Sequence, residues 1–146
     1  MQEIFLKFSE VLLMTYTIQQ ISTMFGLSHP TLRYYEEIGL LPPVARNSGK
    51  QRVYTEEHIN RLRAIECFKD AELSIAKMQD FFRYEENLTE NIDPILLLVQ
   101  EQETELSQRI ETLQKALSHI QHKVRYYDGI KKAMEANTAW PRWEDC

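Results

Sequence analysis

The sequence predicts a mainly α-helical fold, in which a small domain of short helices and one β-hairpin precedes a long helix. Only 4 of the 146 residues are glycine, which disfavours a fold of many strands and turns. Helix-capping residues open several short segments before residue 84, and an apolar heptad runs through the C-terminal part. We therefore divide the chain into an N-terminal extension (1–14), a small domain (15–84), a linker (85–93), a dimerisation helix (94–134) and a tail (135–146).

Composition and charge exclude several classes of protein. The hydrophobic fraction of 43 % suits a soluble chain, and no apolar run is long enough to cross a membrane. The first fourteen residues contain no small-residue cleavage site, so a signal peptide is not expected. The two cysteines lie too far apart for a disulfide framework and fit a reducing compartment. We expect a cytoplasmic protein.

Two short helices joined by a glycine open the small domain. Thr17–Gln20 has the form of a capping box, and Gly26 is expected to end the first helix. Ser28 is predicted to cap the second helix, with Pro30 in its first turn and Gly39 at its end. This arrangement predicts a helix-turn-helix motif.

The second of these helices contains the stretch LRYYEEIGLLPP (residues 32–43), in which two tyrosines are neighbours. Adjacent helical residues point about 100° apart, so Tyr35 is predicted to pack inward while Tyr34 points outward beside Arg33. Such an outer face either enters a DNA major groove or is an ordinary solvated surface. The helix alone leaves both interpretations open.

A basic hairpin is predicted directly after this motif. Its strands are Val44–Arg46 and Arg52–Tyr54, and residues 47–50 form the turn. The whole chain has a net charge of −5, yet the segment Val44–Arg63 holds five basic residues against two glutamates. Local charge determines attraction to phosphate, so the hairpin is predicted to be a wing that clamps the DNA backbone. The alternative is a small surface hairpin with ordinary charges.

Two further helices are predicted after the hairpin, capped by Thr55 and Ser74. The first of them contains Cys67. A thiol inside a helix is most often a small buried hydrophobe. Alternatively, Arg63 and Lys69 favour the thiolate of Cys67 and make it reactive.

The long helix contains apolar residues at alternating spacings of four and three, the pattern of a coiled-coil seam. Such a helix cannot bury its seam alone, so we expect a homodimer, although the seam could instead pack on the N-terminal domain. The tail holds Trp140, Trp143 and Cys146, and it could cap the dimer, fill an effector pocket or lack order. The predicted seam comprises Leu106, Ile110, Leu113, Leu117, Ile120, Val124 and Tyr127.

No motif of an enzyme or a metal centre is found. The sequence has no glycine-rich phosphate loop, nucleophile elbow or paired carboxylates in a plausible pocket. Its histidines are dispersed, and His119 and His122 are interpreted as surface residues of the long helix rather than as metal ligands. We expect neither catalysis nor a cofactor.

From about Tyr16 to Tyr127 the sequence resembles the MerR family of bacterial transcription regulators, through the motif LRYYE…GLL.P…R…R.Y and the long heptad helix. The resemblance implies a winged helix-turn-helix dimer joined by an antiparallel coiled coil. It also implies binding to promoters with an overlong spacer, which the dimer bends and untwists for RNA polymerase. The expected DNA-contacting residues are Thr17, Ser28, His29, Thr31, Arg33, Tyr34, Tyr35, Arg46, Lys50, Arg52 and Tyr54.

The effector class is inferred from the same resemblance. Residues 91–98 lack the cysteines of the family's metal sensors, and the chain is too short for the ligand domain of its multidrug sensors. It is most similar to the NmlR and AdhR branch, which responds to aldehydes and thiol stress and has a cysteine where IECFKDAELSI places Cys67. The competing hypotheses are a helical dimerisation adaptor, and a regulator that senses a small molecule without cysteine chemistry.

Two features depart from the family pattern. The usual wing sequence is G-x-R-x-Y, whereas here Gly49 lies one residue further from Arg52. Members also usually begin close to Tyr16, so Met14 is an alternative start and residues 1–13 form an extension.

Overall fold

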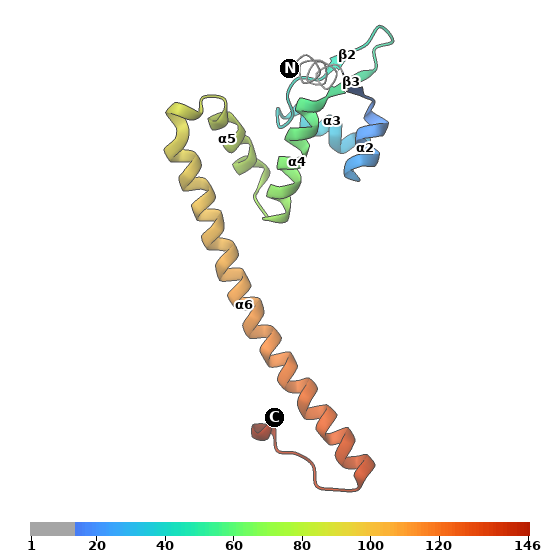
Figure 1. The fold of residues 1–146 in the computed structure, drawn as a ribbon, viewed down its shortest axis with the longest axis vertical. Coiled ribbons are helices and arrows are strands. Elements are labelled where there is room, and N and C mark those ends of the chain that lie inside the picture. The colour runs from blue at the N-terminus through green and yellow to red at the C-terminus, as the bar shows by residue number, and fades with distance from the viewer. Residues whose placement is uncertain (1–13) are drawn as a thin grey trace, which may run out of the picture. The chain divides into compact units, whose positions relative to one another are not determined.

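The computed structural model describes residues 14–146; the predicted extension, residues 1–13, lies outside this range. The contacts divide the chain into two units, of which the first ends at Val99 and the second comprises Gln100–Cys146. Figure 1 shows the elements, which in chain order are β1 (Thr15–Tyr16), α2 (Ile18–Phe25), α3 (His29–Glu37), β2 (Ala45–Arg46), β3 (Arg52–Thr55), α4 (Glu56–Asp70), α5 (Ile75–Glu85), α6 (Leu88–Ala136) and a 3-10 helix (Trp143–Asp145).

The predicted helix-turn-helix is confirmed, together with its caps. The Thr17 hydroxyl accepts the N–H of Gln20 at 3.1 Å, and the Gln20 side chain accepts the N–H of Thr17 at 2.8 Å. Gly26 ends α2 with φ +62°, a conformation that glycine adopts without steric cost. The Ser28 hydroxyl accepts the N–H of Thr31 and caps α3. Local sequence rules therefore determine both helix starts and the turn between them.

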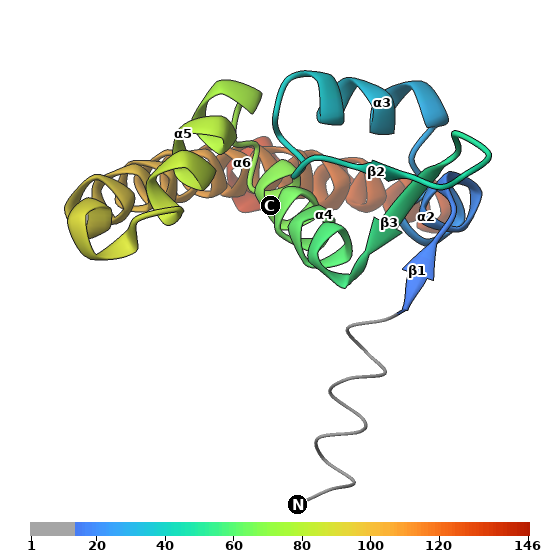
Figure 2. The ribbon, with the colours of Figure 1, turned by 90° about the horizontal axis from the view of Figure 1, so that it is seen from above.

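The three strands form one small antiparallel sheet in the order β1-β3-β2, and they can be followed in Figure 2. Strands β2 and β3 are the predicted hairpin, with Arg46 opposite Arg52. Strand β1 was not predicted, because two residues are too short to show an alternating pattern. It pairs Tyr16 with Tyr54 and so joins the start of α2 to the base of the hairpin.

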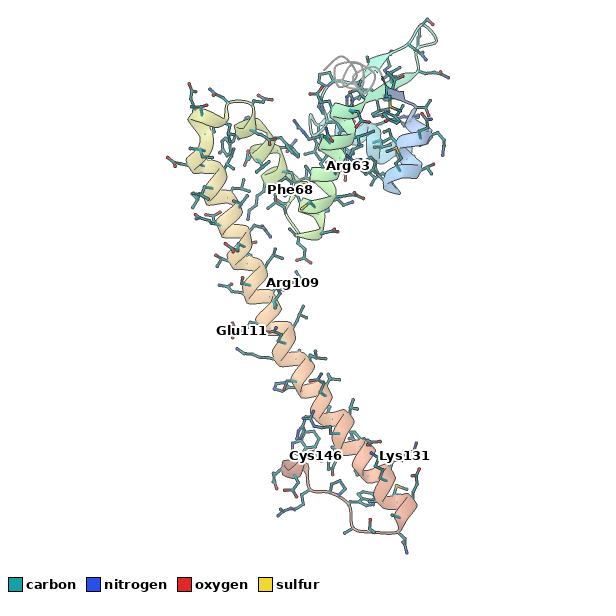
Figure 3. The ribbon with its side chains drawn as sticks, in the orientation of Figure 1. Arg63, Phe68, Arg109, Glu111, Lys131 and Cys146 are labelled. Carbon is teal, nitrogen blue, oxygen red and sulfur yellow. The ribbon has the colours of Figure 1, made fainter. Side chains whose placement is uncertain are left out.

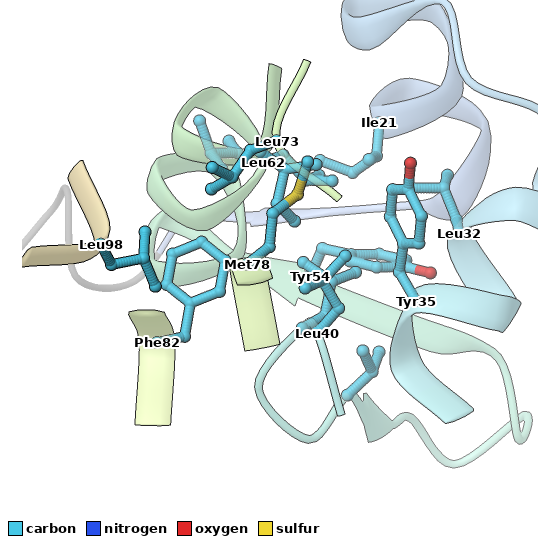
Figure 4. Close-up of a cluster of buried hydrophobic side chains, with 14 residues drawn as sticks. Ile21, Leu32, Tyr35, Leu40, Tyr54, Leu62, Leu73, Met78, Phe82 and Leu98 are labelled. Carbon is cyan, nitrogen blue, oxygen red and sulfur yellow. The ribbon is translucent and has the colours of Figure 1, made fainter. Parts of the chain in front are cut away.

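One hydrophobic core unites the helices and the sheet of the first unit (Figure 4). Its side chains come from α2, α3, β3, α4, α5 and the start of α6. Each fully buried aliphatic side chain stabilises such a core by about 1.5–3 kcal/mol, so the positions of α3 and of the hairpin are fixed together. The buried residues are Ile21, Leu32, Tyr35, Leu40, Leu41, Val44, Tyr54, Ile59, Leu62, Ile65, Leu73, Met78, Phe82 and Leu98.

The segment predicted as a polar linker, residues 85–93, is largely helical, since α5 extends to Glu85 and α6 begins at Leu88. The predicted start near Pro94 corresponds instead to an irregularity, because Asn91 has non-helical dihedral angles. A proline in a helix removes one backbone hydrogen bond and clashes with the preceding turn. The distortion at Asn91, three residues earlier, accommodates this effect without ending the helix.

The second unit consists of the distal part of α6 and a tail that folds back on it. Asn137, with φ +53°, ends the helix, and the Thr138 N–H donates to the Ala133 carbonyl at 2.9 Å. The Trp143 ring then packs edge-on against His122 and Tyr126, with centroid distances of 4.1 and 5.0 Å. The tail is therefore an ordered segment packed on its own helix, so the expectation that it lacks order is wrong, while capping of the dimer and filling of an effector pocket stay untested.

No helix within residues 14–146 is both long enough and apolar enough to cross a membrane.

Candidate nucleic-acid interface

Helix α3 presents the outer face that the sequence predicts. Tyr35 is 5 % exposed and packs in the core, whereas Tyr34 is 46 % exposed and Arg33 beside it is also exposed. The two tyrosine rings lie 6.2 Å apart and are tilted by 46°. The two adjacent tyrosines thus face different surroundings, and of the two only Tyr34, beside the exposed Arg33, is available to a macromolecular partner. The prediction that Tyr35 packs inward is confirmed, and its contact with DNA stays a prediction.

Separate hydrogen-bonded pairs hold the polar residues at the starts of α2 and α3. His29 Nε2 lies 3.1 Å from Gln19 Oε1, and the Ser28 and Thr31 hydroxyls lie 2.8 Å apart. Thr17 and Ser28 are exposed, although their hydroxyls already accept backbone N–H groups as caps. The same side chains therefore hold the two helix starts in place and are exposed to a partner.

The hairpin is tied to α3 through a single carboxylate. Glu36 accepts a hydrogen bond from Arg52 Nε at 2.7 Å, and its second oxygen lies 3.9 Å from an Arg46 nitrogen. The Arg52 side chain is 19 % exposed and that of Arg46 is 44 % exposed. A partly buried charge-assisted hydrogen bond stabilises by about 1.5–3 kcal/mol, so Arg52 fixes the wing on the helix while Arg46 keeps most of its charge in solvent.

The hairpin tip carries an additional cation in a constrained conformation. The Lys50 N–H donates to the Asn47 carbonyl at 2.9 Å and closes the turn. Lys50 adopts φ +59°, a left-handed conformation that is unfavourable for residues with a Cβ atom. The side chain is exposed, so the tip presents a positive charge beyond the arginines.

An open groove of about 410 Å³ lies between the start of α2 and the wing. The N-terminus of a helix carries partial positive charge and free N–H groups, which favour an anion. Arg52 lines the opposite side of this groove. The combination suits a phosphate of a nucleic-acid backbone. The lining residues are Thr15, Tyr16, Thr17, Ile18, Gln19, Asn47, Gln51, Arg52 and Val53.

Tyr54 does not belong to this surface, and the expectation that it contacts DNA is corrected. It is 0 % exposed, because β3 turns it toward the core, where its ring packs edge-on against His58 at 5.5 Å. Its hydroxyl is buried without a hydrogen-bond partner among residues 14–146. Burial raises the pKa of Tyr54 above its ordinary value.

Sequence reasoning missed the buried His58, which anchors the connector between α3 and the wing. His58 Nδ1 accepts the N–H of Thr55 at 3.0 Å, and its Nε2 lies 3.2 Å from the carbonyl oxygens of both Pro42 and Pro43. Because Nδ1 accepts a hydrogen bond, the proton of the neutral ring lies on Nε2, which donates toward these carbonyl oxygens. The only signal in the sequence is the position of His58 three residues after the cap Thr55, where a capping-box side chain would lie.

Two other long side chains hold the segment between α3 and β2, and the sequence predicted neither contact. Arg61 donates to the Leu40 carbonyl at 3.3 Å while its guanidinium lies 3.9 Å from the centre of the Phe82 ring. Gln79 donates to the Ile38 carbonyl at 2.8 Å. Both contacts join residues that are distant in the sequence, so no local pattern reveals them.

Cys67 is exposed on α4, and its interpretation as a buried hydrophobe is wrong. The buried face of α4 is formed by His58, Ile59, Leu62 and Ile65, which leaves Cys67 on the solvent side. Within residues 14–146 no group of three histidine, cysteine, aspartate or glutamate side chains is arranged to hold a metal ion.

The fold and this surface define a winged helix-turn-helix protein. Residues 16–85 match the model of the MerR HTH family regulatory proteins. The transcriptional regulator AdhR of Bacillus subtilis is 44 % identical over 64 residues, which is 44 % of this chain and 46 % of AdhR.

Solved structures extend the similarity into the long helix. A MerR family regulator from Listeria monocytogenes superimposes with a TM-score of 0.74 at 30 % identity, covering 83 % of this chain and 92 % of that one. HiNmlR, a MerR family regulator lacking the sensor domain and bound to promoter DNA, gives a TM-score of 0.70 at 26 % identity, covering 86 % and 92 %. The chain belongs to the MerR family of transcription regulators.

Proposed function

We propose that this protein binds promoter DNA as a homodimer and regulates transcription by distorting an overlong promoter spacer. The observation that carries the proposal is the pairing of an exposed recognition face on α3 with a basic wing that Glu36 holds beside it. A second copy is needed to place two such faces on a pseudo-palindromic site. Bending and untwisting the spacer would draw on the binding energy of both half-sites.

Within this proposal the interface residues have two kinds of role. Exposed side chains contact the DNA directly, with Arg33 and Tyr34 in or beside the major groove and Arg46 and Lys50 on the backbone next to the groove. Arg52 acts mainly through its bond to Glu36, which sets the angle of the wing. The remaining contacts are assigned to the helix starts, at Thr17, Ser28, His29 and Thr31.

The proposed dimer is formed by the distal part of α6. Apart from the half-buried Leu106, its apolar side chains at heptad spacing are exposed in the single chain, and exposed apolar stripes of this kind are typical of surfaces that bind a partner. The proposed contacts are Leu106, Ile110, Leu113, Leu117, Ile120 and Val124.

Footprinting of the protein on its own upstream region tests DNA binding, with Arg33→Ala as the decisive variant. Removing one arginine contact should weaken binding by about 1–3 kcal/mol, without changing the thermal unfolding of the protein. Arg109→Ala is the matched control (Figure 3), because Arg109 lies on α6 in the second unit. Equal affinities of the wild type and Arg33→Ala would instead support a dimerisation adaptor that does not bind DNA.

The proposed effector response involves Cys67. Its exposure makes the sulfur accessible to a thiol-reactive aldehyde, and AdhR is similar over the DNA-binding part of the chain. Addition of such an aldehyde should alter transcription from the target promoter with the wild type and with Cys146→Ser, but not with Cys67→Ser. A normal response of Cys67→Ser would favour a regulator that senses a small molecule elsewhere.

A further inference from the structure

The apolar seam of α6 is flanked at each end by one charged residue. Seven residues before Ile110 lies Glu103, and seven residues after Val124 lies Lys131. Seven residues make two helical turns, so both charges lie on the same stripe as the apolar side chains. Both are exposed, and both belong to the second unit. The stripe is therefore apolar in its centre, acidic at one end and basic at the other.

This stripe is exposed from Ile110 to Tyr127, whereas Leu106 at its start is half-buried. The side chains of Ile110, Leu113, Leu117, Ile120, Val124 and Tyr127 are between 55 % and 63 % exposed. Monomeric proteins rarely leave so continuous an apolar surface in water. A partner with the same apolar spacing is required to cover it.

The tail does not provide that cover. It packs on His122 and Tyr126 through Trp143, and on Gly129 through Pro141, which lies so close that a Cβ atom at Gly129 would be 2.9 Å from Pro141 Cγ. These helix positions lie two residues away from the seam positions, which corresponds to a rotation of about 200° around the helix. The tail also reaches Lys123 and Arg125 beside the seam. Val124 and Tyr127 nevertheless remain 62 % and 63 % exposed, so the seam is left for a second copy.

The positions of the two charges distinguish the possible directions of that second copy. Glu103 and Lys131 lie fourteen residues on either side of Leu117. In an antiparallel pair centred near Leu117, Glu103 lies next to the partner's Lys131, and symmetry repeats this contact at the other end. In a parallel pair, each charge would face its identical counterpart, and like charges in a seam are unfavourable.

We propose that Glu103 and Lys131 form two symmetric ion pairs between the copies, and that these pairs fix the antiparallel direction and the register of the dimer. The inference rests on the proposed homodimer and adds the residues that align it. A slip by one heptad would move each charge about 10 Å from its partner and place it against apolar side chains. Polar residues in a seam specify register in this way at some cost in stability.

Charge reversal tests the pairing. In sedimentation equilibrium, Glu103→Lys and Lys131→Glu should each raise the dimer dissociation constant about tenfold or more, because each places like charges together at both ends. The double variant Glu103→Lys/Lys131→Glu restores opposite charges and should dissociate like the wild type. Glu111→Lys is the matched control (Figure 3), since Glu111 lies on α6 outside the seam and pairs with Lys115 in its own chain.

Cross-linking tests the direction independently. In a Cys67→Ser/Cys146→Ser background, a short bis-maleimide linker should join copies only when Glu103→Cys and Lys131→Cys proteins are mixed. Two Glu103 positions of an antiparallel dimer lie about 42 Å apart, so Glu103→Cys alone should stay uncoupled. Coupling of Glu103→Cys with itself would show a parallel dimer and overturn the inference.

The two proposals fail in different ways. A monomeric wild type would overturn the proposed homodimer together with its ion pairs. A dimeric wild type whose two charge-reversal variants dissociate like Glu111→Lys would overturn the ion pairs alone.

Discussion

The two units of this molecule use similar apolar side chains in opposite ways. In the first unit Ile21, Leu32 and Leu40 are 0 % exposed, whereas Ile110 and Leu117 in the second are each 55 % exposed. Apolar periodicity shows which face of a helix needs to be covered, but it does not show what covers it. In the first unit other helices and the sheet of the same chain cover it, and in the second we assign this role to another chain.

This difference determines how each unit depends on concentration. The first unit has its own core, so its stability should be independent of association. An isolated helix gains little stability from its own hydrogen bonds, so the distal part of α6 should be stabilised mainly by pairing, and its melting should depend on protein concentration.

The largest expected effect comes from breaking the exposed seam at its centre with Leu117→Asp. The carboxylate would be buried against its symmetric copy, so we expect the dimer dissociation constant to rise at least about 100-fold, which is at least about 2.8 kcal/mol. Footprints on the promoter should disappear at concentrations at which the wild type protects it. Analytical ultracentrifugation and circular dichroism measure the loss of the dimer and of distal helix.

Ser118→Asp is the control for this change, because Ser118 is exposed on α6 one residue away from the seam. It adds the same charge about 100° around the helix and should leave the dimer intact. If both variants remain dimeric, the seam is not the interface between the copies.

The second effect concerns the core of the first unit and is seen at high pH. Burial raises the pKa of Tyr54 above its ordinary value of 10.0, so the folded protein retains a proton that the unfolded chain loses. This contribution to stability is complete below pH 10 and is lost as the pH rises above it. The free energy of unfolding, from urea titrations between pH 7 and pH 11, should therefore fall above pH 10.

Tyr54→Phe should remove part of that fall while changing stability at pH 7 by less than about 1 kcal/mol, since its buried hydroxyl has no partner to lose. Tyr16 provides a contrast, because its pKa is raised mainly by the hydrogen bond that it donates to Glu56 at 2.7 Å. Tyr16→Phe should weaken the protein at pH 7 by losing this bond. A Tyr54→Phe variant as sensitive to high pH as the wild type would show that another group titrates.

The sequence predicted those features that depend on neighbouring residues. Thr17, Gly26 and Ser28 cap their helices as expected, since a cap is determined within four residues. The opposite orientations of Tyr34 and Tyr35 follow equally from helical geometry. The sequence therefore predicted which face of α3 is exposed, the face that we propose for DNA recognition.

What the sequence did not predict depends on contacts across the fold. The bond from Arg52 to Glu36 spans 16 residues, and the bond from Gln79 to Ile38 spans 41. Strand β1 exists only because it pairs with β3, and two residues give no signal of their own. For Tyr54 the family motif led to a wrong prediction. The motif suggested contact with DNA, whereas the pairing of β3 turns the side chain into the core.

The smallest expected effect is at the wing tip, where stability and binding make opposite demands on Lys50. The family pattern has glycine two residues before the wing arginine, which is the position of Lys50, and Lys50 adopts the left-handed φ that glycine favours. Lys50→Gly should relieve about 1 kcal/mol of strain, of which the greater freedom of glycine in the unfolded chain offsets part. We expect the free energy of unfolding, measured by thermal unfolding, to rise by about 0.5 kcal/mol.

The same change should weaken promoter binding slightly and lower its dependence on salt by about one phosphate contact, because the tip loses a cation. Lys50→Ala separates the two effects, since it removes the charge but keeps the Cβ atom in the strained turn. It should bind DNA like Lys50→Gly without the gain in stability. Equal stabilities of the two variants would mean that the left-handed conformation does not destabilise the protein. Lys50 would then favour DNA binding without lowering the stability of the fold.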